Sequence, residues 1–181
     1  MGANFTTFKG WFNDVANSRL VARFGSSTDS IRLTATGVTV PGTMTVTGAS
    51  TLTGGVAAAA GVTSSSASAG IGYATGAGGT VTQATSRTTG VTLSKTCGQI
   101  TTDTSSLAAG AEAEFTVTNT TVAATDVVVV TITPGGTGTP HAYVSAVAAG
   151  SFKITITNLH ASTADTSADV INFAVIKAVT A

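Results

Sequence analysis

The chain carries very little charge for its length. Only 9% of its 181 residues are Asp, Glu, Lys or Arg, and eight basic residues balance eight acidic ones. Nucleic-acid-binding domains usually carry a clustered basic field, so this balance argues against nucleic acid as a partner. A near-neutral surface also promotes association, which a protein that works inside a fixed assembly tolerates.

Cysteine and histidine are almost absent. The single cysteine, Cys97, excludes an intramolecular disulfide framework, and its alternating context VTLSKTCGQI predicts a small buried side chain. The two histidines, His141 and His160, stand outside any HxH or HExxH pattern. Asp165 and Asp169 lack the spacing of a calcium-binding loop. We therefore expect neither a metal nor any other cofactor.

Long apolar runs are also missing. The longest are VAAAAGV at 56–62 and VVVV at 127–130, and both are too short to cross a bilayer. The N-terminus lacks the basic start and the long apolar core of a signal peptide. We therefore expect a soluble protein that is made without export and has no membrane partner.

Threonine is the residue that stands out, at 37 of 181 positions, and Gly, Ala, Val and Ser supply most of the rest. The β-branched residues Thr and Val suit pleated, half-buried strands. This composition favours an all-β fold.

Residues 71–181 show the alternation of half-buried strands. Phe115 and Val117 should face one way, as should Phe152, Ile154 and Ile156, with polar residues opposite. Seven segments are expected to be strands: 81–85, 90–101, 113–122, 126–133, 141–149, 151–158 and 170–179. Short strands at roughly ten-residue spacing predict a C-terminal antiparallel β-sandwich or jelly-roll-like domain.

The run VVVV at 127–130 does not alternate. A strand that is apolar on both sides is expected to be covered on both faces. Either a central position in the sheet or a contact with another subunit would satisfy this.

Residues 1–35 hold four of the seven phenylalanines and the only tryptophan. Three of these aromatics and one valine follow the i, i+3, i+4, i+7 spacing of one helix face: Phe8, Trp11, Phe12 and Val15. The pattern predicts a helix capped by Asn4 or Thr6 and ending near Arg19. A helix this short cannot bury so many aromatics alone, so they pack against the rest of the chain or dock onto another protein. In the second case the docking side chains are Phe5, Phe8, Trp11, Phe12 and Val15.

Residues 36–70 begin with TGVTVPGTMTVTGASTLTGG, in which glycine recurs about every six residues, and continue as an Ala/Gly/Ser-rich linker. Apolar residues form two rows at this spacing: Val40, Val46 and Leu52, then Val38, Met44 and Val56. Burying the apolar side chains of one such unit contributes a stabilising free energy of about 3–6 kcal/mol. Ordering six residues costs about 9 kcal/mol, so one unit is unstable alone.

Repeats of this kind become stable by stacking on neighbours. Three chains wound around one axis would enclose a core made of Val38, Val40, Met44, Val46 and Leu52. The alternative is a Thr-rich meander attached to the C-terminal domain.

The run TGVTVPGTMTVTGASTLTGG resembles the Gly-punctuated, Thr/Val-rich shafts of tailed-bacteriophage fibres. The segments IGYATGAGGTVTQATSRTTGVTLSKTCGQIT, ATDVVVVTIT and VINFAVIKA resemble a domain of phage virion structural proteins. Hosts of this domain include head fibres, decoration proteins and tail appendages. The resemblance implies a homotrimer with an N-terminal virion anchor at 1–35, a short Gly/Thr-rich shaft and linker at 36–70 and an outer β-domain at 71–181.

The shortness of the shaft favours a head fibre or decoration (cement) protein, assembled into the virion in the host cytoplasm. Its partners would be two further copies of itself and the major capsid protein or another virion protein. The first alternative is a tail-fibre or receptor-binding module whose outer loops, such as 134–140 or 159–168, contact the host surface. The second is an enzyme that uses Glu112 and Glu114 as a carboxylate pair. Such residues more often solvate a strand edge, so we expect no enzymatic activity.

Overall fold

The computed structural model describes residues 10–14, 19–23, 43–68 and 70–179. By its internal contacts the chain divides into two units, residues 1–60 and 61–181. Every regular element in the described residues is a strand. The described part of the chain accordingly has no helix long and apolar enough to cross a membrane.

The first unit contains a two-stranded hairpin. Strand β1 (Gly10–Asp14) pairs antiparallel with β2 (Arg19–Arg23), with Gly10 opposite Arg23. The helix expected to end near Arg19 is therefore wrong for the described residues. Both strands, GWFND and RLVAR, contain the aromatic and β-branched residues that suit a strand. The hairpin also supplies backbone partners to a segment too short to be stable as a lone helix.

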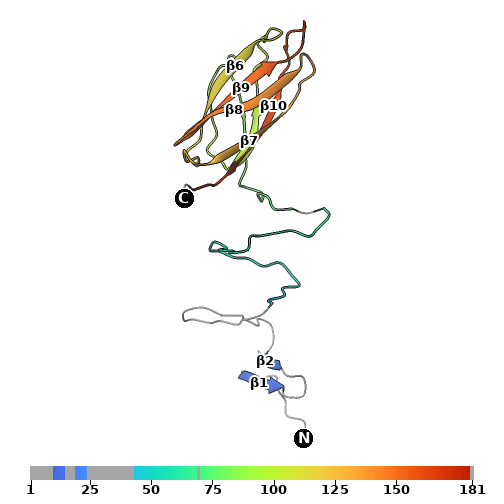
Figure 1. The fold of residues 1–181 in the computed structure, drawn as a ribbon, viewed down its shortest axis with the longest axis vertical. Coiled ribbons are helices and arrows are strands. Elements are labelled where there is room, and N and C mark those ends of the chain that lie inside the picture. Colours follow the sequence, from blue (N-terminus) through green and yellow to red (C-terminus); the bar gives the residue numbers. More distant parts are fainter. Residues whose placement is uncertain (1–9, 15–18, 24–42, 69, 180–181) are drawn as a thin grey trace. The chain divides into compact units, whose positions relative to one another are not determined.

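The second unit contains two sheets of four strands (Figure 1). The order in the first, here called the β10 sheet, is β3-β5-β10-β7; the order in the second, the β9 sheet, is β4-β6-β9-β8. The strands of the β10 sheet are β3 (Thr80–Thr82), β5 (Cys97–Thr101), β10 (Val170–Ile176) and β7 (Val127–Thr133). Those of the β9 sheet are β4 (Val91–Thr92), β6 (Glu112–Thr118), β9 (Ser151–Asn158) and β8 (Pro140–Ala148).

Both sheets are mixed, which corrects the expectation of a purely antiparallel domain. Strand β3 runs parallel to β5, and β4 runs parallel to β6. The cause lies in residues 90–101, expected to be one strand. The chain is interrupted at 93–96, where the Asn119 side chain donates a hydrogen bond of 2.7 Å to the Lys95 carbonyl. Strand β4 before the break joins one sheet, and β5 after it joins the other.

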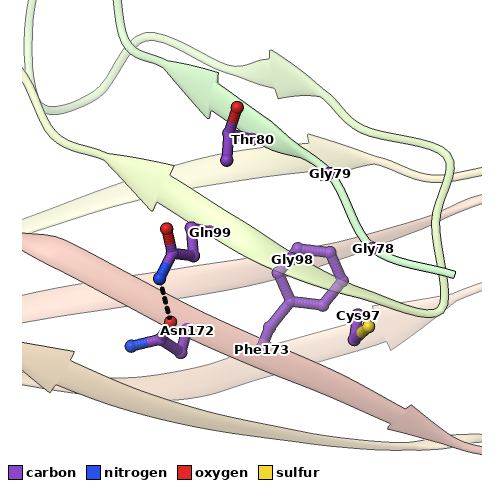
Figure 2. Close-up of a pocket in the computed structure, with 8 residues that line it drawn as sticks. All are labelled: Gly78, Gly79, Thr80, Cys97, Gly98, Gln99, Asn172 and Phe173. Carbon is purple, nitrogen blue, oxygen red and sulfur yellow. Dashed lines mark hydrogen bonds between the residues drawn. The ribbon is translucent and has the colours of Figure 1, made fainter. Parts of the chain in front are cut away.

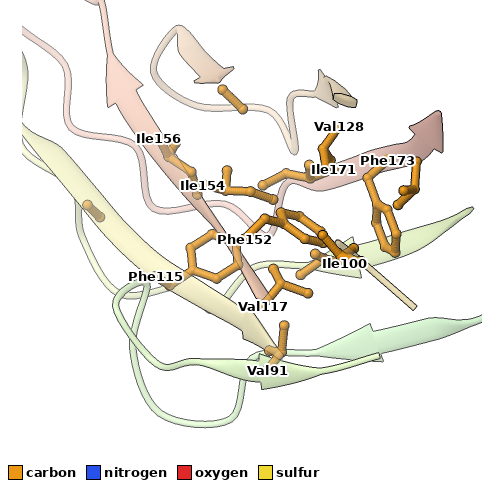
Figure 3. Packing of buried hydrophobic residues seen from close by; sticks show 14 of the residues in the cluster. Val91, Ile100, Phe115, Val117, Val128, Phe152, Ile154, Ile156, Ile171 and Phe173 are labelled. Atoms are coloured by element: carbon orange, nitrogen blue, oxygen red, sulfur yellow. The ribbon is translucent and has the colours of Figure 1, made fainter. Parts of the chain in front are cut away.

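The apolar core lies between the two sheets and receives side chains from both (Figure 3). The inward positions expected from alternation are confirmed, because Phe115, Val117, Phe152, Ile154 and Ile156 are all buried. Across the core, the ring centroids of Phe152 and Phe173 lie 5.3 Å apart. The described domain is therefore a sandwich-like pair of sheets that share one core.

A tight turn joins β8 to β9 at Gly150, whose φ of 80° lies in the left-handed region that favours glycine. The Gly150 N–H donates to the Val122 carbonyl, and its carbonyl accepts from Asn119 N–H, at 2.9 and 2.8 Å. The turn is thus fastened to the loop that follows β6. Further along β8, a bulge between Val144 and Ala146 shifts the register with β9.

Candidate interaction surfaces

The segment 43–68, which precedes the sandwich, leaves its large apolar side chains exposed in a single chain. None of the residues 43–68 lies in a strand. Its apolar side chains are open to water: Met44 is 66% exposed and Leu52 64%, and Val46, Val56 and Val62 are exposed as well. Val38 and Val40, the other expected members of the apolar rows, lie outside the described residues. One chain leaves the described apolar rows of this segment uncovered.

The expected anchor residues fall partly on the β1–β2 hairpin. Trp11 and Phe12 lie in β1, where Trp11 is opposite Ala22 and Phe12 opposite Val21. Phe5, Phe8 and Val15 lie outside the described residues. The helical spacing that grouped these residues does not apply to a strand, in which successive residues point to opposite faces.

The outer face of the β10 sheet carries no charge at its described positions. Its outward residues are Thr80 and Thr82 on β3, Cys97, Gln99 and Thr101 on β5, Val170, Asn172, Ala174 and Ile176 on β10, and Val127, Val129, Thr131 and Thr133 on β7. One end is apolar, with Val127 51% exposed, Val129 48% and Ile176 55%. Strand β7 is an edge strand. The central-strand explanation of the VVVV run is therefore wrong, and its outward valines face water in one chain.

The outer face of the β9 sheet, in contrast, is charged and polar. Lys153 Nζ lies 2.6 Å from Glu114 Oε1, and the Ser145 hydroxyl donates to Glu114 Oε2 at 2.8 Å. These bonds, led by the one from Lys153, lower the pKa of Glu114. Glu112 accepts a hydrogen bond from the Thr157 hydroxyl at 2.9 Å. A general acid for glycoside hydrolysis needs a raised pKa, and the pKa of Glu114 is shifted in the opposite direction.

A shallow pocket of about 380 Å³ opens beside β3, β5 and β10 (Figure 2). Three glycines, Gly78, Gly79 and Gly98, line the pocket together with Phe173. A Cβ at Gly98 would lie 3.0 Å from the Phe173 ring. Gln99 Nε2 donates to Asn172 Oδ1 at 2.9 Å across its rim. Cys97 also lines the pocket and is only partly buried, which corrects the expectation of a buried cysteine.

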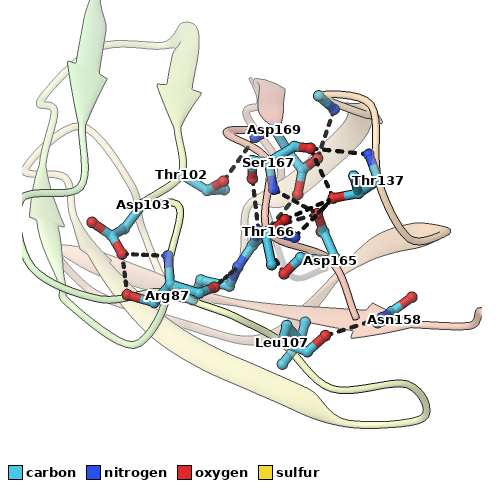
Figure 4. A network of polar contacts seen from close by, with 12 residues as sticks. Arg87, Thr102, Asp103, Leu107, Thr137, Asn158, Asp165, Thr166, Ser167 and Asp169 are labelled. Atoms are coloured by element: carbon cyan, nitrogen blue, oxygen red, sulfur yellow. Dashed lines mark hydrogen bonds and ion pairs between the residues drawn. The ribbon is translucent and has the colours of Figure 1, made fainter. Parts of the chain in front are cut away.

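A buried cluster of charged side chains lies at the opposite end of the β10 sheet (Figure 4). Arg87 is 3% exposed, and Asp165 and Asp169 are fully buried. Arg87 Nη1 lies 2.9 Å from Asp169 Oδ2, and Nη2 lies 3.3 Å from Asp165 Oδ1. The guanidinium also donates to the carbonyls of Ser105 and Ser167, each at 2.7 Å. One cation therefore serves two carboxylates and three loop carbonyls, the third being that of Asp165 at 3.5 Å.

The same cluster ties the loop 134–139 to the loop 159–169. Gly135 N–H donates to Asp169 Oδ1 at 2.8 Å. Thr137 N–H donates to the Ser167 hydroxyl at 2.9 Å, and Thr139 N–H donates to Asn158 Oδ1 at 3.0 Å. These bonds hold the two loops in one arrangement. Asp165 Oδ2 has no hydrogen-bond partner among the described residues.

Burial is the main cause that raises the pKa of the Asp169 carboxyl, although Arg87 and the Gly135 N–H oppose it. Sequence reasoning missed this cluster. The spacing of Asp165 and Asp169 does not match a calcium-binding loop and indicates no other site. Arg87 lies 78 residues before Asp165, in a Thr-rich turn, so nothing in the sequence connects it with the two aspartates. The one available signal was the presence of charged residues in loops of a chain that has so few.

The histidines have local roles. His160 Nδ1 accepts hydrogen bonds from Ser162 N–H and Thr163 N–H, at 3.1 and 2.8 Å, and so shapes the loop after β9. The ring of His141 lies beside that of Tyr143 on β8, with centroids 6.4 Å apart. Among the described residues, no group of three or more His, Cys, Asp or Glu side chains could hold a metal ion.

Comparison of the chain with protein-family models, with curated proteins and with solved structures gave no match. The function is therefore inferred from the surfaces described above and from the residues that carry the sequence resemblance.

Proposed function

We propose that this chain is a homotrimeric structural protein of a bacteriophage particle, of the head-fibre or capsid-decoration type. Residues 1–35 attach it to the capsid or another virion protein, residues 36–56 interlock three chains, and the sandwich faces outward. Its action is adhesion without catalysis, multiplied by the three-fold symmetry of the anchor. The virion assignment rests on the resemblance of residues 36–55 and 71–181 to phage shafts and virion domains.

The observation that supports a trimer is the uncovered segment 43–68. Met44, Val46 and Leu52 follow the six-residue rows, and all three are exposed in one chain. Burying such side chains stabilises an assembly by about 1.5–3 kcal/mol each. Contact between identical segments around an axis gives every chain the same gain, because closed symmetric oligomers repeat one interface.

The trimer is tested by the mass of the full chain in solution. Sedimentation equilibrium should give three times the 17.6 kDa of one chain. The double variant Met44→Ser, Leu52→Ser should shift the mass towards one chain, whereas Thr45→Ser with Thr51→Ser should leave it unchanged. A mass of one chain for the unmodified protein would refute the trimer.

The anchor is tested by attachment to particles that lack this protein. Deletion of residues 1–24, or Trp11→Ala, should abolish attachment and leave a soluble trimer. The matched substitution Asn13→Ala, on the same strand, should attach normally. Attachment that survives the deletion would show that the anchor lies elsewhere.

A second candidate, a tail-fibre or receptor-binding module, is favoured by the tied loops 134–139 and 159–169. They lie at the end of the β10 sheet where Thr133 pairs with Val170, while residues 78–79 adjoin Cys97 at the other end. The loops thus lie at the end of the sheet away from residues 78–79 and are fixed in shape. Copy number in purified particles separates the candidates, because hundreds of copies indicate the capsid and about a dozen the tail.

A further inference from the structure

We propose that one end of the outer face of the β10 sheet is the surface on which the sandwiches of neighbouring copies pack together. The patch, here called the β10 patch, consists of Cys97, Val127, Val129, Ala174 and Ile176. This inference rests on the proposed trimer and extends it from the shaft to the outer domain.

The β10 patch is continuous across three strands. Val127 is opposite Ile176, and Val129 is opposite Ala174, in the pairing of β7 with β10. Ala174 is in turn opposite Cys97 in the pairing of β10 with β5. Outward residues that are direct neighbours in a sheet form one surface, so these five side chains make a single apolar area at one end of the face.

The two outer faces differ in charge, and only that of the β9 sheet has the charged side chains typical of a solvent-exposed face. The β9 sheet carries Glu112, Glu114 and Lys153 outward, joined by an ion pair and hydrogen bonds. The outward positions of the β10 sheet carry no charged residue. Lys177, which follows Ile176, is paired with Asp126 of its own chain. A neighbour can therefore cover the β10 patch without burying an unpaired charge.

Strand β7 also lacks the usual protection of a sheet edge. Of the four edge strands in the two described sheets, β3 and β4 have only three and two residues. Strand β8 begins with Pro140 and contains a bulge. Strand β7 is VVVVTIT, seven residues with neither charge nor proline. Edges of this kind invite pairing with another chain, and a fixed contact with a sister copy prevents uncontrolled association.

The occupant is a second copy because the chain enters the sandwich beside the patch. The Tyr73 hydroxyl donates a hydrogen bond to the Val175 carbonyl, on the strand that carries Ala174 and Ile176. In a trimer joined through residues that precede Tyr73, each chain therefore enters its sandwich beside its own β10 patch. A three-fold axis gathers one patch from each copy around it, so a single apolar patch per chain is sufficient.

Cysteine cross-linking on the full chain tests this arrangement. In a Cys97→Ala background, Val129→Cys places one thiol in the β10 patch, and Glu112→Cys places one on the outer face of the β9 sheet as the matched control. A short bismaleimide should join most Val129→Cys chains into covalent dimers and few of the control chains. Val127→Cys serves as a second reporter if Val129→Cys lowers the yield of folded protein.

Sedimentation of the same samples separates the possible failures. A trimer whose patch cysteines cross-link no better than the control overturns the β10 patch and leaves the shaft trimer standing. A monomeric mass without cross-linking overturns both. A trimer with patch-specific cross-links that are lost when Ile176→Lys is added supports the contact, provided that the control reacts with a monofunctional maleimide as readily as the patch variant.

Discussion

Replacing Arg87 by methionine removes the guanidinium that faces both Asp165 and Asp169 while keeping much of the side-chain volume. The wild-type guanidinium lies 2.9 Å from Asp169 Oδ2 and 3.3 Å from Asp165 Oδ1. Both carboxyls are fully buried, so the variant leaves them without a facing cation. Breaking a buried ion pair by removing one partner costs about 3–5 kcal/mol. We expect a loss of that size in the free energy of unfolding.

The loss should depend on pH, and its sign follows from the pKa of Asp169. Arg87 lowers this pKa against the effect of burial, so its removal raises the folded-state pKa further. A carboxyl with a raised folded-state pKa contributes most below its unfolded pKa of about 3.9, and the contribution is lost as the pH rises through the folded pKa. The deficit of Arg87→Met should therefore be larger near neutral pH than near about pH 4.

Urea unfolding followed by circular dichroism measures the deficit, at one fixed protein concentration because association shifts apparent stability. Lys153→Met is the matched control, since it breaks the exposed pair with Glu114 and should change stability little. A deficit below about 1 kcal/mol, the usual effect of a surface change, or one that is equal at both pH values, would refute the reasoning.

Three further outcomes are expected. Phe152→Ala should lower the free energy of unfolding by about 3–5 kcal/mol, because it empties a fully buried aromatic site; a loss below half of this in urea unfolding would contradict the assigned core. Gly138→Ala should lower the melting temperature more than Gly150→Ala. Both glycines have positive φ, which costs a side chain about 1–2 kcal/mol, but only at Gly138 would a new Cβ lie 2.6 Å from a neighbour, the Cβ of Asp165; equal shifts would contradict this. The pKa of Asp126 is lowered, chiefly by the Ala123 N–H, so its contribution is present above its unfolded pKa and lost as pH falls through the folded one. Asp126→Asn should therefore show a shallower loss of stability in acid than the wild type, and identical pH profiles would count against it.

The parts of the fold that the sequence predicts are those set by local alternation. Strands β6 and β9 show it plainly, since Phe115, Val117, Phe152, Ile154 and Ile156 are all buried. Alternation records which face of a strand is inside. Alternation does not indicate which strand pairs with which. The parallel pairs β3–β5 and β4–β6 could therefore not be predicted from it.

The β1–β2 hairpin shows the limit of periodicity in a short segment. The aromatic spacing around Trp11 fits a helix face, yet the described residues pair as strands. Strand formation is favoured by the antiparallel partner RLVAR, which begins nine residues after the start of β1. It pairs in register with Trp11 and its neighbours. The spacing of apolar residues within one segment gives no information on the backbone hydrogen bonds that the following segment can form with it.

The buried cluster around Arg87 was beyond sequence reasoning for a related reason. Its charged members come from two loops, one before β4 and one before β10, and each loop looks unremarkable alone. The contacts that unite Arg87 with Asp165 and Asp169 span 78 and 82 residues. Only the closure of the two sheets brings these loops to one end of the domain.

The parallel pairing of β3 with β5 has a mechanical consequence. Strand β3 is the first strand of the sandwich, and Tyr73, just before it, is bonded to Val175 on β10. A pull on the chain before Tyr73 reaches this tyrosine first and then β3. Thr80, Val81 and Thr82 are aligned with Gln99, Ile100 and Thr101, so a tension along the strands loads their hydrogen bonds together in shear instead of peeling them one at a time. The sandwich is therefore joined to the preceding residues in a geometry that resists separation of its first strand.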